Sequence, residues 1–556
     1  MEIKIEIGNW QYNAGIVGLV SILDNFQKNS VRFEENSIYF DSKELENFEE
    51  KYFNYLIKVY EKTLSWHKIV SFENKISYFK GKEIDENDLK EINTYIKDVL
   101  KKYLKSNSYV AAYDFIDGDI DPIKEEKNLK PIALKKNEKI SDKVKEIKDV
   151  LNKIEDIIKY LSSENGKKYI CGKSLIYTII KNGWGGVSFL NAQTKEKDIY
   201  KDFKNYFIIP TIEYLEDDKT KYKYNCFVCD REIKNLDNDF NFLINTGFDV
   251  SRKTSYVWDF NNDIAICPIC KLIYSCVPIG FTYVYDSGIF INSNTNAKEL
   301  IRINSRIKSE IYREDSISGI YKILNKELQE DIKYELEDIQ LVRFEIHGKE
   351  NPKNKNENKR YFFNILSKNM IRVLINSKAD FNKIENVFYK LNGENYSLTD
   401  DVTRKVLNNE NLFNLIHKII YSKISGDSQY LSERAIFSTI KINFRLLKER
   451  GYMENKEIDI LTEARETGEK LKWKYKAKDA EHKLQGICYR ILNGIKTNNI
   501  SMTMDTILNC YLYCGEYVPK IITKMISEEE TFKEIGYAFV SGLIPKKYDE
   551  NDKGGN

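Results

Sequence analysis

The sequence predicts an α+β protein, in which a mixed N-terminal domain carrying a four-cysteine zinc module is followed by an all-α C-terminal helical bundle. Three features indicate this architecture. The chain begins with alternating apolar and charged residues, two C-x-x-C pairs lie near its middle, and apolar residues recur at helical spacing after about residue 399. We expect one domain at 1–398, with the zinc module at about 222–275, and a second domain at 399–556.

The first part of the chain mixes strand and helix signals. Residues 3–7, I-K-I-E-I, alternate as a strand does, and residues 31–40 alternate in the same way. A turn-rich stretch between them opens an apolar helix. Helical spacing of apolar residues follows over 44–105 and again over 135–162, where lysine and glutamate cover one face.

The rest of the chain moves from loops and strands to helices. Residues 181–193 hold three glycines and several amides between apolar segments, which indicates an ordered loop. Residues 280–292 alternate as strands and lead through an Asn-rich turn to a helix from Glu299. From about Thr399, four or more helical segments follow with short Gly, Asn or Pro breaks, which is typical of a helical bundle.

The two cysteine pairs, C-F-V-C and C-P-I-C, are separated by 37 residues. A C-x-x-C turn points two thiolates at one ion, and two such turns complete a closed tetrahedral zinc site. A closed site has no open position for substrate, so we expect Zn²⁺ to serve structure. The alternatives are unrelated pairs or a redox motif, which needs one pair only. The expected ligands are Cys226, Cys229, Cys267 and Cys270, and Cys276 ranks below them.

The charge balance does not mark a nucleic-acid-binding protein, because 87 basic residues face 85 acidic ones. Arginine is scarce, with none between Arg32 and Arg231. Arg302 and Arg306 follow the first cysteine pair. Arginine makes bidentate contacts to phosphates and bases, so these two are candidate nucleic-acid contacts, with solvated surface arginines as the alternative.

Cysteine usage and the N-terminus predict the compartment. Nine cysteines in a chain without a secretory leader suggest a reducing environment. The charged, alternating start is not a signal peptide, and the longest apolar stretch, 14–23, is too short to span a bilayer. We expect a cytoplasmic protein with no membrane segment.

Residues suited to catalysis do not form a recognised motif. The four histidines lack metal-binding spacing, and the G-K-S at 172–174 lacks the earlier glycine of a phosphate-binding loop. Glu232 and Lys234 have the E-x-K form of some metal-dependent nucleases. An acidic run could hold Mg²⁺, although Asp-Gly and Asp-Pro already explain a turn there; it comprises Asp114, Asp117, Asp119 and Asp121. We expect no enzyme, with a zinc-stabilised nuclease as the alternative.

Four features occur in one order: W-Q-Y-N-A-G-I-V-G-L-V-S-I-L, the two C-x-x-C pairs, G-I-F-I-N-S-N and a helical C-terminus. In this order the chain resembles the large subunit of a type I-B CRISPR effector complex (Cascade), of the Cys-x-x-Cys/Cys-x-x-Cys kind. The segments G-I-C-Y-R-I-L-N-G-I-K-T-N-N, M-D-T-I-L and G-Y-A-F-V-S-G-L, within 486–543, strengthen the resemblance, which covers most of the chain. The cysteine pairs alone are shared with many zinc ribbons.

The resemblance implies binding rather than catalysis. Such a subunit sits at the 5′-handle end of the CRISPR RNA, reads the protospacer-adjacent motif in duplex DNA, helps to open the duplex and supports the displaced strand. The implied partners are CRISPR RNA, target double-stranded DNA, the other Cascade backbone and small subunits, and a helicase-nuclease recruited in trans, with no membrane. A standalone zinc-ribbon DNA-binding protein is a further alternative.

Reading a short DNA motif needs amides or arginines on a rigid loop. Two loops carry such residues: Asn182, Trp184, Asn191 and Gln193 in the first, and Asn292, Asn294, Asn296 and Lys298 in the second. Turn-forming asparagine is the alternative for each amide. Trp184 is a candidate wedge in the opened duplex, with a buried core tryptophan as its alternative.

The stretch K-L-K-W-K-Y-K-A-K at 470–478 alternates lysines with aromatic and other residues. Lysines neutralise phosphates, and aromatic rings stack on single-stranded bases. The candidate contacts are Lys470, Lys472, Trp473, Lys474, Lys476 and Lys478. The alternative is a solvated lysine face over a partly buried tryptophan, and acidic flanks dilute the local field.

The last 104 residues, 453–556, follow Gly451, a break between helices, and are numerous enough to bury a core of their own, though marginally. The resemblance implies that the small subunit can arise by internal translation within the large-subunit gene. We therefore hypothesise that Met453, or a non-Met start nearby, begins a second product.

Overall fold

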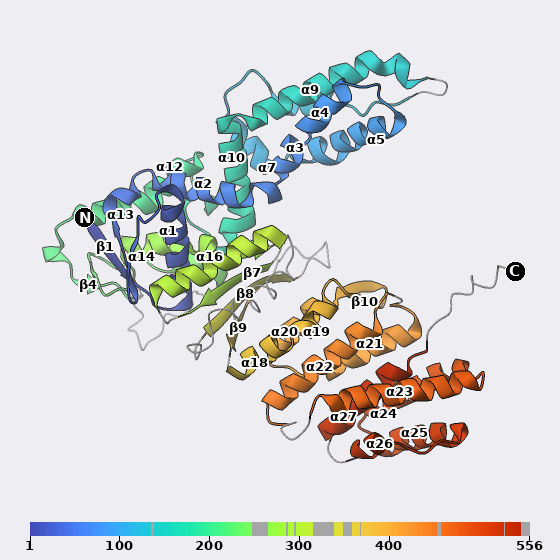
Figure 1. Ribbon diagram of the computed structural model, residues 1–556. Coiled ribbons are helices and arrows are strands. Elements are labelled where there is room, and N and C mark those ends of the chain that lie inside the picture. The colour runs from blue at the N-terminus through green and yellow to red at the C-terminus, as the bar shows by residue number, and fades with distance from the viewer. Residues whose placement is uncertain are drawn as a thin grey trace. The chain divides into compact units, whose positions relative to one another are not determined.

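The computed structural model describes residues 1–134, 138–246, 265–284, 287–293, 296–314, 339–347, 358–366, 368–428, 430–452, 457–526 and 529–545. The chain forms two compact units. The first unit comprises Met1–Ser305 and Arg343–Tyr361, and the second unit comprises Arg306–Val342 and Phe362–Asn556. Figure 1 shows both, with helices predominant and small sheets in the N-terminal and middle regions, as the fold class predicted from the sequence requires.

A three-stranded antiparallel sheet opens the first unit. Its order is β1-β3-β2, with β1 at Glu2–Glu6, β2 at Arg32–Glu34 and β3 at Ser37–Asp41. Ile3 and Ile5 are buried while their neighbours in β1 are exposed, which is the alternation of a sheet with one covered face. The strands expected at the N-terminus and in the hairpin are confirmed.

Helix α1, Trp10–Phe26, packs tightly on the helices that follow the second cysteine pair. The Asn9 side chain caps it by accepting bonds from the backbone N–H groups of Gln11 and Tyr12, both at 3.0 Å. A Cβ added at Gly15 would lie 2.4 Å from the carbonyl oxygen of Ile273, and one at Gly18 would lie 2.1 Å from that of Cys276. Glycine at these positions therefore allows backbone-to-backbone contact with α14, Pro268–Ser275, and α15, Val277–Gly280.

Helices make up most of the remaining first unit, as the spacing over 44–105 and 135–162 predicted. They are α2 Phe48–Tyr60, α3 Ser65–Val70, α4 Glu73–Lys80, α5 Glu86–Tyr95, α6 Lys101–Tyr103, α7 Asn107–Tyr113, α8 Pro122–Asn128, α9 Val144–Ser162, α10 Glu164–Leu175, α11 Lys181–Gly183, α12 Ile199–Phe203 and α13 Ile209–Glu216. In the part of the chain that the structure describes, no helix is both long and apolar enough to cross a bilayer.

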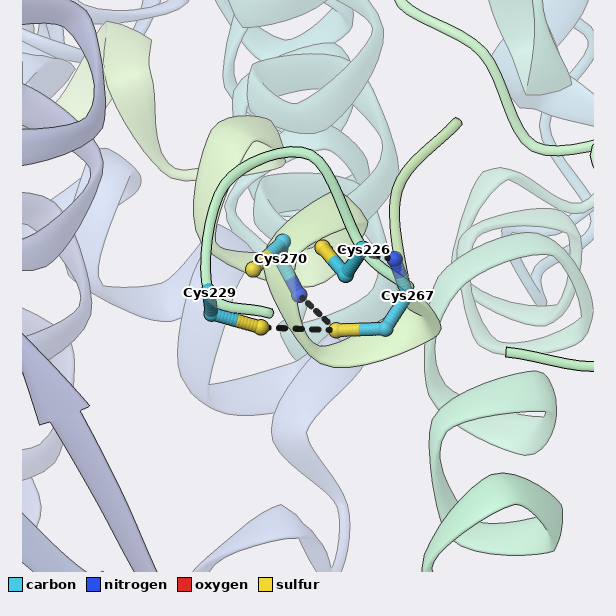
Figure 2. Close-up of side chains that lie close together, drawn as sticks. All are labelled: Cys226, Cys229, Cys267 and Cys270. Carbon is cyan, nitrogen blue, oxygen red and sulfur yellow. Dashed lines mark hydrogen bonds between the residues drawn. The ribbon is translucent and has the colours of Figure 1, made fainter. Parts of the chain in front are cut away.

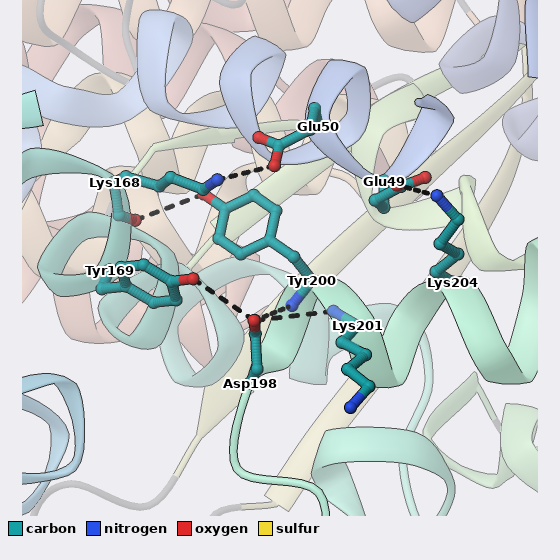
Figure 3. A network of polar contacts seen from close by, with 8 residues as sticks. All are labelled: Glu49, Glu50, Lys168, Tyr169, Asp198, Tyr200, Lys201 and Lys204. Atoms are coloured by element: carbon teal, nitrogen blue, oxygen red, sulfur yellow. Dashed lines mark hydrogen bonds and ion pairs between the residues drawn. The ribbon is translucent and has the colours of Figure 1, made fainter. Parts of the chain in front are cut away.

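A polar network joins α2, α10 and α12 (Figure 3). Lys168 of α10 donates to Glu50 of α2 at 2.6 Å, and Lys204, directly after α12, donates to Glu49 at 2.8 Å. The Tyr169 hydroxyl donates to Asp198, which also caps α12. Because Glu49 is buried, its pairing with Lys204 avoids the cost of an isolated buried charge, and the network fixes how these three helices pack.

A four-stranded sheet has the order β6-β7-β8-β9. Its strands are β6 Thr282–Val284, β7 Ser287–Asn292, β8 Ile339–His347 and β9 Asn358–Leu366, and α16, Ala297–Glu314, follows β7. The strands expected within 280–292 and the helix expected near Glu299 are confirmed. Along the chain, the division between the two units falls within α16, β8 and β9.

From α18 onward, the described part of the second unit is helical apart from the hairpin of β10, Phe388–Leu391, and β11, Glu394–Ser397. Its helices are α18 Lys368–Asn376, α19 Lys378–Ile384, α20 Leu398–Leu407, α21 Phe413–Ser425, α22 Glu433–Glu449, α23 Asp459–Ala477, α24 Leu484–Lys496, α25 Ile500–Cys514, α26 Lys520–Lys524 and α27 Glu529–Leu543. Gly426 and Gly515 end α21 and α25 with φ values of 88° and 71°. The helical C-terminal region is confirmed.

The second unit begins earlier in the chain than the expected domain boundary between residues 398 and 399. Asp380 of α19 explains part of this difference. Its carboxylate accepts bonds from Ser438 at 3.0 Å and from Arg445 at 2.7 Å, both on α22. These buried polar contacts hold α19 to the C-terminal helices, although nothing in the local sequence marks Asp380 as their partner. The boundary at 398/399 itself stays a prediction.

Candidate metal centre

The first cysteine pair lies in a tight turn between two short strands, β4 at Tyr224–Asn225 and β5 at Glu232–Ile233. The backbone N–H of Cys226 donates to the carbonyl of Arg231 at 2.8 Å, and that of Asp230 donates to the carbonyl of Cys226 at 2.9 Å. Asp230 has a φ of 58°, a left-handed conformation that aspartate tolerates better than most residues. The turn therefore aims both thiols of the pair to one side.

The second pair opens helix α14. Cys267 is the residue that caps this helix, and its sulfur accepts the backbone N–H of Cys270 at 3.4 Å. Pro268 occupies the first helical position, where a missing N–H costs nothing. The helix thus fixes the two sulfurs about one turn apart, with both cysteines buried.

The four sulfurs converge, as Figure 2 shows. They lie within 4.8 Å of one another, and the sulfurs of Cys229 and Cys267 are 3.6 Å apart. In a tetrahedral zinc site, a Zn–S bond of about 2.3 Å places two sulfurs roughly 3.8 Å apart. The number, type and spacing of the donors therefore suit a zinc ion, and the cluster expected from the spacing of the pairs is present.

Neighbouring groups favour ionised sulfurs on Cys226 and Cys229, whereas hydrogen bonds from neighbouring thiols raise the pKa of Cys267 and burial raises the pKa of Cys270. The backbone N–H of Cys267 donates to the sulfur of Cys226 at 3.2 Å. Hydrogen bonds from Cys229, Cys267 and Cys270, and from this N–H, hold the pKa of the Cys226 thiol below its usual range. The Tyr12 hydroxyl lies 3.4 Å from the sulfur of Cys270, and burial raises the pKa of Tyr12 so that the hydroxyl stays protonated and is able to donate. Such donors orient and stabilise thiolate ligands.

Arg231 supplies the positive charge nearest the cluster. Although burial opposes it, the cysteines at 229 and 267 raise the pKa of Arg231. Its guanidinium donates to the carbonyl of Lys4 in β1. Arg231 therefore offsets the charge of the thiolates and ties the turn to the N-terminal sheet.

Sequence reasoning missed both Tyr12 and Arg231 as neighbours of the cysteines. The long arginine-free stretch that ends at Arg231 is a signal that could have identified it. Cys276, the reserve ligand, lies outside the cluster. Burial raises the pKa of Cys276 to about 12, and its sulfur contacts the carbonyl of Leu272 at 3.5 Å.

The first expected DNA-reading loop is partly buried. Trp184 is 0 % exposed, and its indole N–H donates to the carbonyl of Ser275 at 3.0 Å. A fully buried ring has no face for a base, so the structure favours the core tryptophan over the wedge. Asn182 is also buried and donates to the carbonyl of Thr178. Asn191 and Gln193 are exposed and form a turn, in which the Asn191 side chain accepts the N–H of Gln193.

The second expected DNA-reading loop also contains both buried and exposed residues. Asn292 is 3 % exposed, and its side-chain oxygen accepts a bond of 2.8 Å from the amide of Asn13, which is also buried. Asn294 lies outside the described residues. Asn296 accepts the N–H of Glu299 at 2.8 Å and so caps α16, while Lys298 is exposed. Asn292 and Asn296 therefore have structural roles in this conformation.

The two candidate arginines both lie on α16, Ala297–Glu314, and are half-exposed. The guanidinium of Arg302 pairs with Glu299 one turn earlier, with a nitrogen-to-oxygen distance of 2.9 Å. This ion pair reduces the charge that Arg302 offers to a phosphate. Contact of Arg302 and Arg306 with nucleic acid stays a prediction.

The lysine-rich stretch forms the end of α23, as expected. Lys470, Lys474, Lys476, Lys478 and Trp473 are exposed, and Lys472 is half-buried. Trp473 is 63 % exposed, which leaves much of its ring in solvent. Some lysines already have partners: Lys474 pairs with Glu516 at 2.5 Å and Lys478 donates to the carbonyl of Tyr513 at 3.0 Å. Contact with a single strand stays a prediction.

Three of the aspartates in the nuclease alternative serve local structure. Asp121 caps α8, Asp117 accepts a bond from Asn165 at 3.2 Å, and Asp114 pairs with Lys197 at 3.6 Å. The side chain of Glu232 is exposed on β5. Among the described residues, only the four cysteines bring three or more possible metal ligands together.

Comparison with known proteins adds one finding. Residues 219–282, which contain both cysteine pairs and all of α14 and α15, match the model of a family described as CRISPR-associated protein (Cas_CXXC_CXXC). No curated protein matches the chain. The match and the four clustered cysteines agree on the same segment, because the family is characterised by the two C-x-x-C pairs that the fold brings together.

Proposed function

Because residues 219–282 match a family of CRISPR-associated proteins with two C-x-x-C pairs, we propose that the chain is the large subunit of a type I-B RNA-guided DNA surveillance complex. The observation that carries this proposal is the four-cysteine cluster within the matching segment. The helical C-terminal region and the order of the N-terminal features support it, since the resemblance rests on the same order.

In this proposal the subunit binds the 5′-handle end of the CRISPR RNA, recognises the protospacer-adjacent motif, supports strand opening and recruits a separate helicase-nuclease. It has no catalytic role of its own. A Zn²⁺ held by the four cysteines would cross-link the β4–β5 turn to α14 and would provide no reactive chemistry, because a four-cysteine site leaves no open position for a substrate.

The accessible side chains among the expected contacts remain in the proposal. They are Asn191, Gln193, Lys298, Lys470, Trp473, Lys474, Lys476 and Lys478. Exposed lysines and an exposed tryptophan suit contact with phosphates and unstacked bases. Asn182, Trp184 and Asn292 are left out, because their side chains are buried and engaged in internal hydrogen bonds.

The test is co-expression of the tagged chain with the neighbouring genes and a CRISPR array, followed by affinity purification and RNA sequencing. The proposal predicts co-purification of the other subunits and of CRISPR RNA with intact 5′ handles. Purification of the chain alone, with specific duplex binding that needs no RNA, would instead identify a standalone DNA-binding protein. Mg²⁺-dependent cleavage by the isolated chain that is lost in Glu232→Ala would identify a nuclease.

A further inference from the structure

A cavity of about 560 Å³ lies beside the metal centre in the first unit. One wall is formed by residues 4–12, which comprise part of β1, the turn after it and the start of α1. The opposite wall is formed by residues 227–229 of the first cysteine turn together with Arg231, Phe240 and Tyr274. The cavity thus depends on the same contact that places the cysteine turn against the N-terminal sheet.

We propose that this cavity binds one unpaired nucleobase of a single-stranded nucleic acid, with the ring of Phe227 stacked on the face of the base. The inference rests on the nucleic-acid-binding role proposed above. It names a ligand class and a site for which the sequence provided no candidate residue.

Phe227 is the first reason for this assignment. It is the residue after Cys226 in the C-F-V-C turn and is 65 % exposed. Its backbone N–H donates to the carbonyl of Ala265 at 2.9 Å, so the turn that presents the ring is fixed on both sides. A large apolar ring held in solvent by a rigid turn is suited to stacking on a flat partner, and every base offers such a face.

Further rings extend this wall into the cavity. Phe227 contacts Phe240 with ring centroids 6.2 Å apart and planes at 89°, and Phe240 contacts Tyr274 at 5.3 Å and 74°. Aromatic walls of this kind are the common platform of single-strand recognition. The volume also exceeds that of a single side chain, so a ligand the size of a nucleotide has room to enter.

The wall formed by residues 4–12 offers backbone hydrogen-bonding groups. β1 is at the edge of its sheet. The bonds from Ile7 N–H to the Asn36 carbonyl and from Ser42 N–H to the Met1 carbonyl show that the main-chain N–H and carbonyl groups of the odd-numbered residues face β3. The N–H of Lys4 and the N–H and carbonyl of Glu6 therefore point the other way, toward the cavity that both residues line, whereas the Lys4 carbonyl already accepts a bond from Arg231. Donors and acceptors in one row match the edge of a base.

The charges around the cavity favour an uncharged occupant. Lys4 pairs with Glu6, and Arg231 donates to the carbonyl of Lys4 and faces the cysteines. Lys4 and Glu6 offset each other's charge, so the interior suits a neutral ring, although one guanidinium nitrogen of Arg231 is buried without a hydrogen-bond partner among the described residues. The phosphate of the same nucleotide would remain at the solvent side.

The alternative occupant is an extended peptide added to the free edge of β1. The Lys4 carbonyl lies at the middle of this five-residue strand and already accepts a bond from Arg231. An added strand would have to displace that bond in order to form a continuous ladder. The observations therefore favour the nucleobase.

The test measures binding of the full chain to short fluorescent single-stranded oligonucleotides, one RNA and one DNA, each prepared with and without abasic positions. Phe227→Ala should weaken binding about tenfold, as the loss of one stacked base predicts, and Phe227→Trp should retain it. Tyr224→Ala, a matched control in which an exposed ring of the same module is removed outside the cavity, should bind as the wild type does. Zinc content should be unchanged in all three variants.

The abasic oligonucleotides identify the bound group. They should abolish the difference between wild type and Phe227→Ala, and the strand type that shows the larger effect, RNA or DNA, distinguishes a guide strand from a displaced DNA strand. Equal binding by wild type and Phe227→Ala would overturn the cavity assignment alone. Failure of the wild type to bind either strand would overturn the proposed function as well.

A second measurement does not depend on the stability of a variant. An oligonucleotide containing 5-iodouracil, irradiated on the wild-type chain, should cross-link within residues 4–12 or 227–240, which include most of the residues that line the cavity. Cross-links confined to other peptides would overturn the proposal. Loss of a partner protein from Phe227→Ala, with unchanged oligonucleotide binding, would instead assign the cavity to strand addition.

Discussion

At the residue scale, the spacing of the cysteines predicts the four metal ligands but not the side chains that surround them. The four sulfurs meet because each C-x-x-C turn fixes two of them locally, and this could be predicted from the sequence. Tyr12 could not be predicted as a neighbour of the cysteines, because it is 258 residues from Cys270 in the sequence and no local pattern indicates such a contact. The same limit applies to Asn292, whose partner Asn13 is distant in sequence.

Cys226→Ser should remove the bound metal and destabilise the first unit. Structural zinc in small modules contributes on the order of 10 kcal/mol to folding, so the loss of one ligand should lower the yield of soluble protein sharply. Cys276→Ala is the matched control, because Cys276 is buried nearby but lies outside the cluster. Metal analysis and thermal unfolding of both variants check this prediction. Less than half an equivalent of zinc in the wild-type protein would contradict it.

Asn292→Ala should reduce the stability of the first unit by about 1–3 kcal/mol, because the amide of Asn13 would lose its buried acceptor. Asn191→Ala, which removes an exposed amide, should change stability by less than about 0.5 kcal/mol. Denaturant unfolding of the two variants provides the comparison. A stable Asn292→Ala protein that has lost only motif-specific DNA binding would restore the base-reading role expected from the sequence.

At the element scale, the spacing of apolar residues predicts where helices form, but it does not predict which helices pack against one another. The apolar run of α1 and the spacing after Thr399 were sufficient to predict helices. The crossing of α23 and α27 depends on Gly468 and Gly542: an added Cβ would lie 2.1 Å from the Phe539 carbonyl oxygen in one case and 2.0 Å from that of Arg465 in the other. Such a pair of glycines has no local signature, because each is placed by the other helix.

Gly468→Ala should therefore destabilise the second unit by about 1–3 kcal/mol, since the backbones of α23 and α27 would have to separate. Gly486→Ala provides the control on α24, because no atom lies within 4 Å of its added Cβ. That substitution should stabilise the helix by up to about 1 kcal/mol. Circular dichroism during denaturation measures both. Equal stability of the two variants would show that the close crossing is absent.

At the scale of the whole molecule, the hypothesis of a second product starting at Met453 meets a physical limit. Met453 lies outside the described residues, but the helices after it pack on one that precedes it. The buried carboxyl of Glu534 in α27 accepts a bond from Asn443 in α22, and burial raises the pKa of Glu534 to about 8. A product without α22 would lose this partner and expose part of α27, so it should need another subunit to cover that face.

Expression of the intact gene with a C-terminal tag should give two products, one of 65.4 kDa and one much smaller, with the small one recovered only together with other subunits. Immunoblotting of the cell extract and of the purified complex checks this. A single full-length band, with Met453→Leu leaving assembly unchanged, would remove the hypothesis. The large-subunit proposal would still stand.

The central claim is that this chain recognises DNA as part of an RNA-guided complex, and guide dependence of duplex binding tests it most directly. The purified assembly should bind a duplex that matches its guide and carries the correct flanking motif. Binding should weaken when either the match or the motif is removed, and it should be lost after the RNA is degraded. Specific duplex binding that survives removal of the RNA would contradict the account.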